Sequence, residues 1–192
     1  MAARDPRTVR TVEGLRAALR EILKSVPLDQ ISVSELCRAA GVQRTSFYTH
    51  YPSVGDLLTA MLVEAVEDEL DAPDMTGLSI GEVAVAFQRT LTSAYGVVTR
   101  DRGLFQAGFM SNGSSSLRRA LTDMFTRRLR VALQVWISHG VATDVDADVA
   151  VPFAAGGLTG SMEAWVCGDR EDEVRWADSV RDQMPPWWPR PE

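Results

Sequence analysis

The spacing of apolar residues constrains the fold of this chain more than any other feature of its sequence. In the first segment they recur every three or four positions, as on one face of a helix, until Pro27 ends the series. These residues are Val12, Leu15, Leu19, Ile22, Leu23 and Val26. Similar spacing continues over residues 33–40, 43–49, 53–66, 80–99, 103–111, 115–139, 145–167 and 171–183. No segment alternates apolar and polar residues for long enough to predict a strand, so we expect an all-α protein.

Composition is typical of a globular protein. Of the 192 residues, 45% are hydrophobic and 24% are charged. The uncharged stretch at residues 149–162 is shorter than the roughly 20 residues of a membrane helix. The first residues lack the apolar region of a secretion signal, and Cys37 and Cys167 are too far apart for a disulfide framework or a zinc knuckle. We therefore expect a cytoplasmic protein without a membrane partner, a metal or a cofactor.

Charge is distributed unevenly along the chain. The formal net charge is −6, yet residues 1–63 carry +2 and residues 64–192 carry −8. A mildly basic N-terminal third on an acidic body favours a polyanionic partner at that end.

Residues 31–51 contain two short predicted helices joined by a sharp turn. Ser32 and Glu35 have the spacing of a capping box at the start of the first helix. Gly41 stands where a left-handed residue is needed to leave that helix. The small side chain of Cys37 lets the two helices cross closely. The apolar residues that would form the core between them are Leu36, Ala40, Val42 and Phe47. This pattern predicts a helix-turn-helix.

Polar side chains remain for the outer surface of the second short helix. A helix presented in this way fits the major groove of DNA, where Arg hydrogen-bonds to guanine and Gln to adenine. Hydroxyl, phenol and imidazole groups beside it suit phosphate oxygens. The predicted DNA-binding residues are Gln43, Arg44, Thr45, Tyr48, Thr49 and His50.

A longer pattern surrounds these residues. It reads Val33-x-x-Leu36-x-x-Ala39-Ala40-Gly41-Val42, then Phe47-Tyr48-x-His50-Tyr51-Pro52-Ser53, then Asp56-Leu57-Leu58. The pattern resembles that of the tetracycline-repressor (TetR) family of bacterial transcription regulators, and the detailed resemblance covers residues 11–66. It implies that residues 43–49 are the recognition helix, with Gln43, Arg44 and Thr45 facing bases and with Tyr48 and His50 holding phosphates.

The resemblance also implies a domain organisation and a function. Residues 1–66 would be the helix-turn-helix DNA-binding domain and residues 67–183 a helical ligand-binding and dimerisation domain. A Pro- and Trp-rich tail, 184–192, would follow and be loose. The implied function is that of a homodimeric regulator, a repressor, that binds a near-palindromic double-stranded DNA site until a small-molecule inducer releases it. No catalytic motif is present in the sequence, so we expect no enzyme activity.

Two positions depart from the family pattern. Family members usually carry Lys at the start of the next helix, where this chain has Val54, and many carry Ser or Thr as the N-cap, where it has Gln43. Losing a cap costs about 1 kcal/mol at most. Losing one phosphate contact lowers affinity and flattens its salt dependence by about one unit. The alternative function is therefore a helical small-molecule-binding protein whose head has lost DNA binding.

Phe and Met residues recur at helical spacings in the second part of the chain. Each one alone is best explained as core, but as a set they suit an adaptable apolar pocket. The resemblance implies an inducer pocket among these helices, which would take a hydrophobic ligand. The predicted lining is Phe87, Phe105, Phe109, Met110, Met124, Phe125 and Met162.

Three glycines fall inside the helical pattern of residues 145–167. Each costs about 1 kcal/mol in a helix unless another backbone approaches closely. The family pairs its last two long helices with those of a second subunit, so these glycines would lie in a dimer interface. The predicted interface is Gly156, Gly157, Gly160, Trp165, Trp176 and Val180. A kink or break at 156–157 is the alternative.

Overall fold

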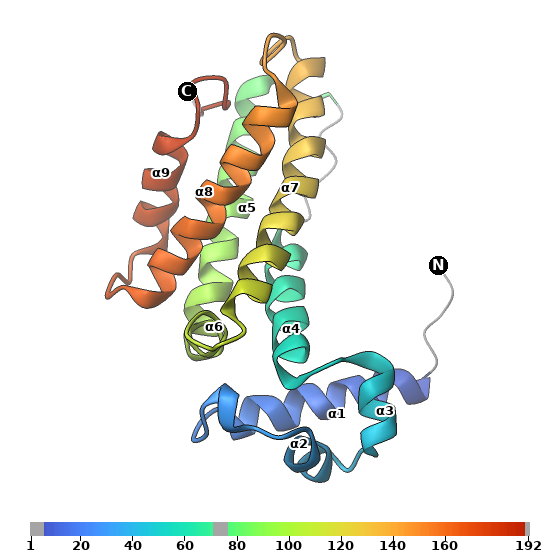
Figure 1. Cartoon of the computed structure of the whole chain (residues 1–192). Helices are drawn as coiled ribbons and strands as arrows, with labels where there is room; N and C mark the ends of the chain where they lie inside the picture. Colours follow the sequence, from blue (N-terminus) through green and yellow to red (C-terminus); the bar gives the residue numbers. More distant parts are fainter. Residues whose placement is uncertain (1–5, 71–76, 191–192) are drawn as a thin grey trace. The chain divides into compact units, whose positions relative to one another are not determined.

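The computed structural model describes residues 6–70 and 77–190, and every regular element in these ranges is a helix (Figure 1). The elements are α1 (Pro6–Ile22), the 3-10 turn η1 (Leu28–Gln30), α2 (Val33–Ala40), α3 (Arg44–His50), α4 (Val54–Glu69), α5 (Ile80–Arg100), α6 (Arg102–Phe109), α7 (Ser114–Ser138), α8 (Ala147–Cys167) and α9 (Glu173–Gln183). The predicted all-α fold is confirmed. None of the described helices combines the length and apolar character that crossing a membrane requires.

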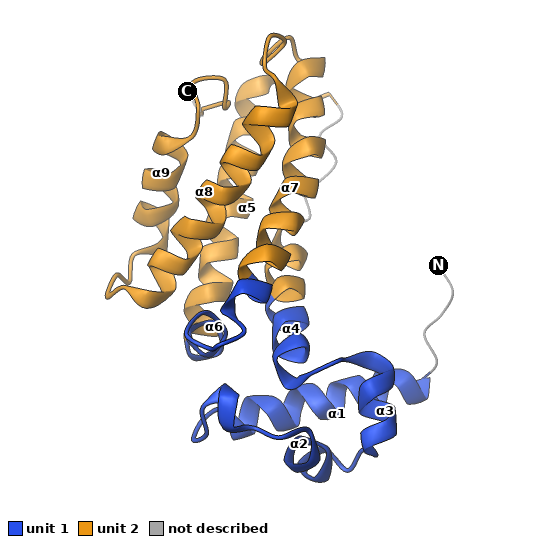
Figure 2. Cartoon of the chain, in the orientation of Figure 1, with its two compact units in different colours: residues 1–62, 103–117 blue, residues 63–102, 118–192 orange. Residues whose placement is uncertain are grey.

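The described residues divide into two compact units, coloured separately in Figure 2. The first unit contains the described residues up to 62 together with 103–117, and the second contains the rest. The segment 103–117, which we expected in the second domain, is therefore part of the first unit. Gly108 of α6 allows close packing there, because a Cβ atom at this position would lie 2.7 Å from Leu117 Cδ2 and 3.1 Å from Leu62 Cδ1.

The first unit is built around α1, α2 and α3. Helix α2 packs against both α1 and α3. Its N-cap is Ser32, whose hydroxyl accepts a hydrogen bond from the Glu35 N–H at 3.1 Å. Gly41 ends the helix in the left-handed conformation, with φ of 66°. The predicted helix-turn-helix is thus present. The fully buried side chains of the first unit include Leu15 and Leu19 of α1, Leu36 of α2 and Phe47 of α3.

In the second unit α5, α8 and α9 contact one another, and polar side chains tie α7 to α8. The guanidinium of Arg118 donates to both carboxylate oxygens of Glu163, at 2.7 and 2.6 Å. This pairing lowers the pKa of the Glu163 carboxyl and raises that of Arg118. The hydroxyls of Thr122 and Thr159 lie 3.1 Å apart one turn further along.

Helix α5 begins with a complete capping box. Ser79 accepts from the Glu82 N–H at 3.3 Å, and the Glu82 carboxylate accepts from the Ser79 N–H at 2.8 Å. The two bonds satisfy N–H groups that the first turn of a helix leaves open. The reciprocal arrangement that the sequence predicted for Ser32 and Glu35 is therefore found at a different helix.

The C-terminus of α8 is capped by an arginine from α6. Arg102 donates to the carbonyl oxygens of Trp165, Gly168 and Arg170, at 3.0, 3.3 and 2.7 Å. Trp165 lies in the last turn of α8, and Gly168 and Arg170 follow the helix, so the cationic group satisfies carbonyls at the helix end and complements the helix dipole. The Arg102 guanidinium also lies 5.5 Å from the centre of the Trp165 ring.

The tail is packed rather than loose over its described residues, 184–190. Met184 and Pro189 are buried, and the rings of Trp187 and Trp188 pack on Trp136 of α7. The expectation of a loose tail is therefore wrong here, because the tail tryptophans find an aromatic surface within the second unit. All five tryptophans of the chain lie in this unit.

Candidate nucleic-acid interface

Helix α3 carries the polar residues that the sequence predicted to contact DNA. Five of the six are exposed, with Tyr48 at 52%. We call these five the recognition surface, and they are Gln43, Arg44, Thr45, Tyr48 and Thr49. His50 is half-buried at the last position of the helix, with its ring 6.3 Å from that of Tyr51.

The opposite side of α3 holds the helix in place. Phe47 is fully buried, and its ring packs edge-on against Tyr48 at 5.5 Å and tilted against Tyr51 at 6.1 Å. Cys37 of α2 is buried as predicted, and burial raises the pKa of its thiol, so it is a packing residue. A helix fixed on one side in this way presents its polar side with little freedom to reorient.

The recognition surface offers a mixture of donors and acceptors. Gln43 is the N-cap residue of α3 by position, but its side chain makes no capping bond, so the amide is not engaged by the helix. The Thr49 hydroxyl donates to the Thr45 carbonyl at 3.0 Å, which leaves its oxygen to accept. Arg44 adds a fork of N–H donors. Such a set matches the donor and acceptor pattern of base edges in the major groove.

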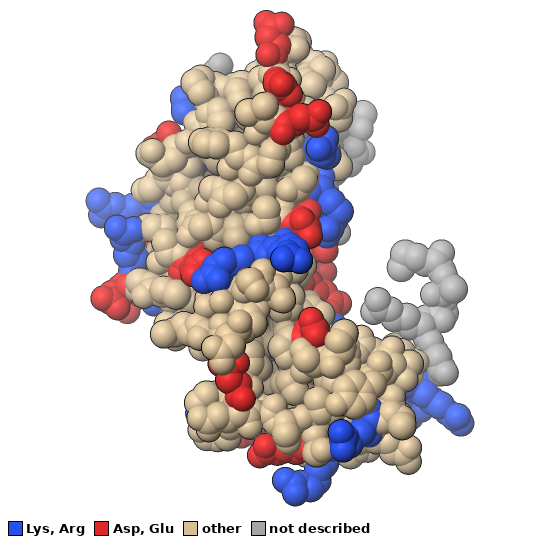
Figure 3. Space-filling model, in the orientation of Figure 1, with Lys and Arg blue, Asp and Glu red and all other residues tan. Residues whose placement is uncertain are grey.

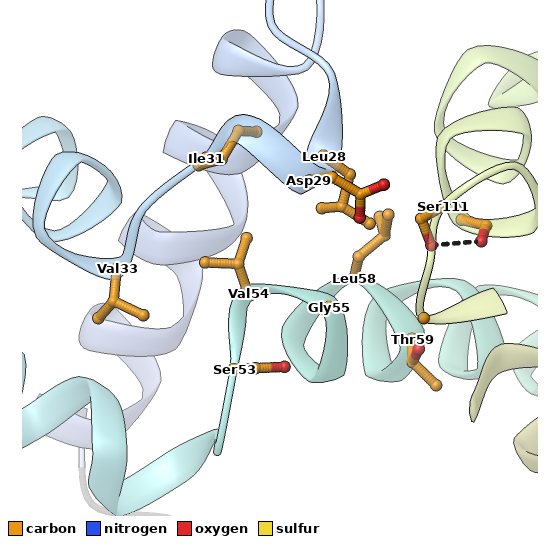
Figure 4. A pocket seen from close by; sticks show the side chains of 12 residues that line it. Leu28, Asp29, Ile31, Val33, Ser53, Val54, Gly55, Leu58, Thr59 and Ser111 are labelled. Atoms are coloured by element: carbon orange, nitrogen blue, oxygen red, sulfur yellow. Dashed lines mark hydrogen bonds between the residues drawn. The ribbon is translucent and has the colours of Figure 1, made fainter. Parts of the chain in front are cut away.

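Val54, at the position where the family usually has Lys, is only 6% exposed. Its side chain borders a cavity of about 350 Å³ within the first unit (Figure 4). The lining consists of Leu28, Asp29, Ile31, Val33, Ser53, Val54, Gly55, Leu58, Thr59, Gly108, Ser111 and Gly113. The Val54 side chain therefore packs within the first unit and is not part of the recognition surface.

The polar groups around this cavity are largely engaged by neighbouring groups. Asp29 accepts from the Asn112 N–H at 3.1 Å, and Ser111 donates to the Gly108 carbonyl at 2.9 Å (Figure 4). Ser53 caps α4 by accepting from the Asp56 N–H at 3.1 Å. The cavity is thus lined by apolar side chains and by polar groups of which Asp29, Ser53 and Ser111 already have partners.

The residues predicted to line an inducer pocket are divided between the two units. Phe105 and Phe109 are buried in the first unit, where Met110 is 77% exposed and borders a second cavity. In the second unit Phe87 is half-buried, and the buried members are Met124, Phe125 and Met162. A lining shared by all seven remains a prediction.

The predicted dimer residues separate into exposed and buried groups. Helix α8 continues without a break through Gly156 and Gly157, which excludes the alternative of a helix break there. These glycines and Gly160 are exposed, with open space around each Cβ position. Trp165 is fully buried against Tyr95 and Trp176, so the expectation that it contributes to an interface is wrong. Trp176 and Val180 are half-buried.

The exposed side of α8 is apolar along its length. We call it the α8 face, and its residues are Val149, Phe153, Gly156, Gly157, Gly160 and Ala164. Phe153 alone is 71% exposed. An apolar helix face exposed over this length is typical of surfaces at which protein partners bind.

Charged side chains of both signs are interspersed over the view of each unit in Figure 3. The recognition surface itself holds one cationic side chain, that of Arg44, and no carboxylate. Electrostatic attraction to DNA at this surface would therefore come from few charges, and hydrogen bonds would carry more of the binding.

No family model and no curated protein sequence matches this chain. The fold, however, is similar to that of solved structures that include TetR-family transcription regulators, as the sequence resemblance implied. The chain is similar to RolR in complex with resorcinol, with a TM-score of 0.62 and 21% identity over 91% of this chain and 87% of that one.

Two further structures extend this likeness. AlkX, a TetR-family repressor from a Dietzia strain implicated in n-alkane biodegradation, has a TM-score of 0.61 at 15% identity and covers 97% of both chains. FadR from Bacillus subtilis in complex with stearoyl-CoA has a TM-score of 0.59 at 16% identity, over 92% of this chain and 96% of that one. Each likeness spans both units.

Proposed function

We propose that this protein is a sequence-specific DNA-binding transcription regulator, and a repressor. The observation that carries the proposal is the recognition surface, a set of adjacent polar side chains exposed on a short helix whose Phe47 is fully buried. The fold supports it, because TetR-family regulators share it and AlkX is described as a repressor.

Four residues of the recognition surface and the neighbouring His50 have roles in this proposal. Arg44 donates to guanine and Gln43 pairs with adenine, the contacts for which their side chains are suited. Tyr48, Thr49 and His50 contact phosphate oxygens and so fix the position of the helix in the groove. Val54 makes no phosphate contact, because its side chain is buried.

A second copy of the chain is part of the proposal. The α8 face is apolar and exposed, and its three glycines would let another helix approach closely. A dimer formed through this face would carry two α3 helices and read a near-palindromic site, with half-sites about 34 Å apart. Trp176 and Val180 of α9 would lie at its edge.

Small-molecule control completes the proposal. RolR and FadR were each solved with a ligand, resorcinol and stearoyl-CoA respectively, on the same fold. An inducer of the present protein would release DNA only by binding the DNA-free state more tightly than the DNA-bound state.

The test is the selection of duplexes from a random DNA pool by the purified protein. We expect enrichment of a near-palindromic sequence, bound more tightly than random DNA and with an affinity that falls as salt rises. A folded, dimeric protein that enriches no sequence would contradict the proposal and favour the small-molecule-binding protein without a DNA-binding head.

A further inference from the structure

Four aromatic rings gather where the tail meets α5 and α7. Trp188 lies 4.4 Å from Trp136 and 6.4 Å from Phe87, measured between ring centres. Trp187 lies 5.7 Å from Trp136, and Phe87 lies 5.3 Å from Trp136. Trp136 is fully buried, whereas the two tail tryptophans are half-buried. The tail thus covers an aromatic surface that two helices provide.

The helical and tail parts of this cluster are held differently. Phe87 and Trp136 belong to long helices, but Trp187 and Trp188 follow the end of α9 in a short irregular segment. The hydrogen bonds described within that segment are a turn from the Trp188 N–H to the Pro185 carbonyl at 2.9 Å and a long contact from Arg190 to the Met184 carbonyl at 3.5 Å. A segment held mainly by its side chains opens more easily than a helix.

The aromatic cluster also contains a buried polar group without a partner among the described residues. The indole N–H of Trp136 is buried and has no acceptor among the residues that the structure describes. Burying a donor without a partner is unfavourable, and such groups in native proteins call for an explanation. The charged side chains near the end of α9 are paired with each other, as between Arg181 and Asp178 at 3.0 Å.

We propose that Phe87 and Trp136 form a binding site for an uncharged, planar aromatic molecule that carries a hydrogen-bond acceptor. Trp187 and Trp188 occupy this site when the molecule is absent. Binding replaces one indole–indole contact by another aromatic contact, and the acceptor receives the hydrogen bond of the Trp136 N–H. The tail is therefore a built-in competitor of the ligand.

Competition of this kind has a measurable consequence. The apparent dissociation constant equals the intrinsic one divided by the fraction of molecules in which the site is open. If the tail leaves the site open in about a tenth of the molecules, removing its rings strengthens binding about tenfold. This inference does not rest on the proposed function, because it concerns binding to the second unit and is tested without DNA.

Quinoline and naphthalene are matched probes, since both are planar two-ring molecules and only quinoline has an acceptor nitrogen. Their affinities are measured by isothermal titration calorimetry on the full chain, on a Trp187→Ala/Trp188→Ala variant and on Trp136→Phe. Trp176→Phe is the control, because Trp176 is also half-buried but packs on Trp165. Circular dichroism establishes that each variant is folded.

We expect quinoline to bind the tail variant about tenfold more tightly than the full chain or the control. We also expect the tail variant to prefer quinoline over naphthalene, and Trp136→Phe to lose that preference. Equal quinoline affinity for the full chain and a folded tail variant, or no binding to either, would overturn the inference. Equal affinity of the tail variant for the two probes would also overturn it, and this comparison stands even if Trp136→Phe fails to fold.

Discussion

Arg44 and Tyr48 lie on the same exposed surface of α3 but would act on DNA in different ways. An arginine that donates to a guanine discriminates against other bases, so Arg44→Ala should relax the preference at one base pair by about 1–3 kcal/mol. A tyrosine on a phosphate carries no sequence information, so Tyr48→Ala should weaken binding to all duplexes alike. Both effects are measured with the selected site, single-base variants of it and random DNA.

A matched control separates these roles from loss of charge. Arg119 is exposed on α7 in the second unit, and Arg119→Ala changes the net charge as Arg44→Ala does. We expect the control to retain the base preference. Equal losses on selected and random DNA for Arg44→Ala would show that Arg44 does not contact a base.

His139 gives the stability of the chain a pH dependence. Its Nδ1 lies 2.8 Å from the Val135 carbonyl oxygen and its Nε2 lies 2.9 Å from that of Leu78. Only the doubly protonated ring donates to both, and these hydrogen bonds raise the pKa of His139. Since the folded state then binds the proton more tightly, the stabilisation is complete below the unfolded pKa of about 6.5 and is lost as pH rises through the raised pKa.

The urea concentration at the midpoint of unfolding should therefore fall as pH rises above about 6.5 and through the raised pKa of His139. His139→Gln should reduce that fall. The only other histidine is His50, so His50→Gln is the natural control. This variant should keep the pH dependence of the unfolding midpoint. An unchanged pH profile for His139→Gln would show that its contacts do not favour the charged ring.

At the scale of elements, the capping box of α5 should contribute measurably to stability. Ser79→Ala removes both the acceptor for the Glu82 N–H and the hydroxyl that fixes the Glu82 carboxylate. The expected cost is about 1 kcal/mol, measured by urea unfolding followed by circular dichroism. Ser93→Ala, at an exposed position in the middle of the same helix, should cost less than the cap variant.

Arg102 should contribute more to stability than the capping box of α5, because its guanidinium donates to three carbonyl groups at and just beyond the end of α8. Hydrogen bonds from a charged group are stronger than neutral ones, so Arg102→Ala should cost about 2 kcal/mol. The measurement is again urea unfolding, with Arg119→Ala as the charge-matched reference. A cost for Arg102→Ala no larger than that of the reference would show that α8 does not depend on this cap.

Element boundaries follow closely from the sequence, because apolar spacing and caps are local signals. The spacing over residues 145–167 predicts most of α8, and Gly41 ends α2 as expected. The Ser79-x-x-Glu82 pattern was present in the sequence and could have marked the start of α5. The 3-10 turn of residues 28–30 has no comparable signal, since so short an element shows no period.

What covers an apolar residue cannot be predicted in the same way. Spacing shows that Trp165 faces one side of its helix, but not whether that side meets its own unit or a second subunit. The same limit applies to residues 103–109 of α6, which pack within the first unit, and to Trp187 and Trp188, which were expected in a loose tail. The exposed positions of α3 were predictable because they follow from one short helix and the buried Phe47.

At the scale of the whole molecule, the α8 face should decide the oligomeric state. Gly157→Glu places a carboxylate in the middle of this apolar face, which should prevent close approach of a second copy. Gly103→Glu is matched, because Gly103 is also an exposed helical glycine with open space around its Cβ position. Analytical ultracentrifugation should find the Gly103 variant dimeric and the Gly157 variant monomeric.

The monomeric variant should also bind a palindromic site less tightly, because each copy then contacts one half-site independently. A Gly157→Glu protein that remains dimeric would show that the subunits associate through another surface.

The placement of every tryptophan in the second unit has an optical consequence. Helix α3 carries Tyr48 and is followed by Tyr51, and every tryptophan lies outside the first unit, so selective excitation of indole produces no emission from the first unit. Emission from this protein therefore reports on the second unit alone. A change in emission when DNA is added would not come from a fluorophore at the recognition surface, so it would directly register communication between the two units.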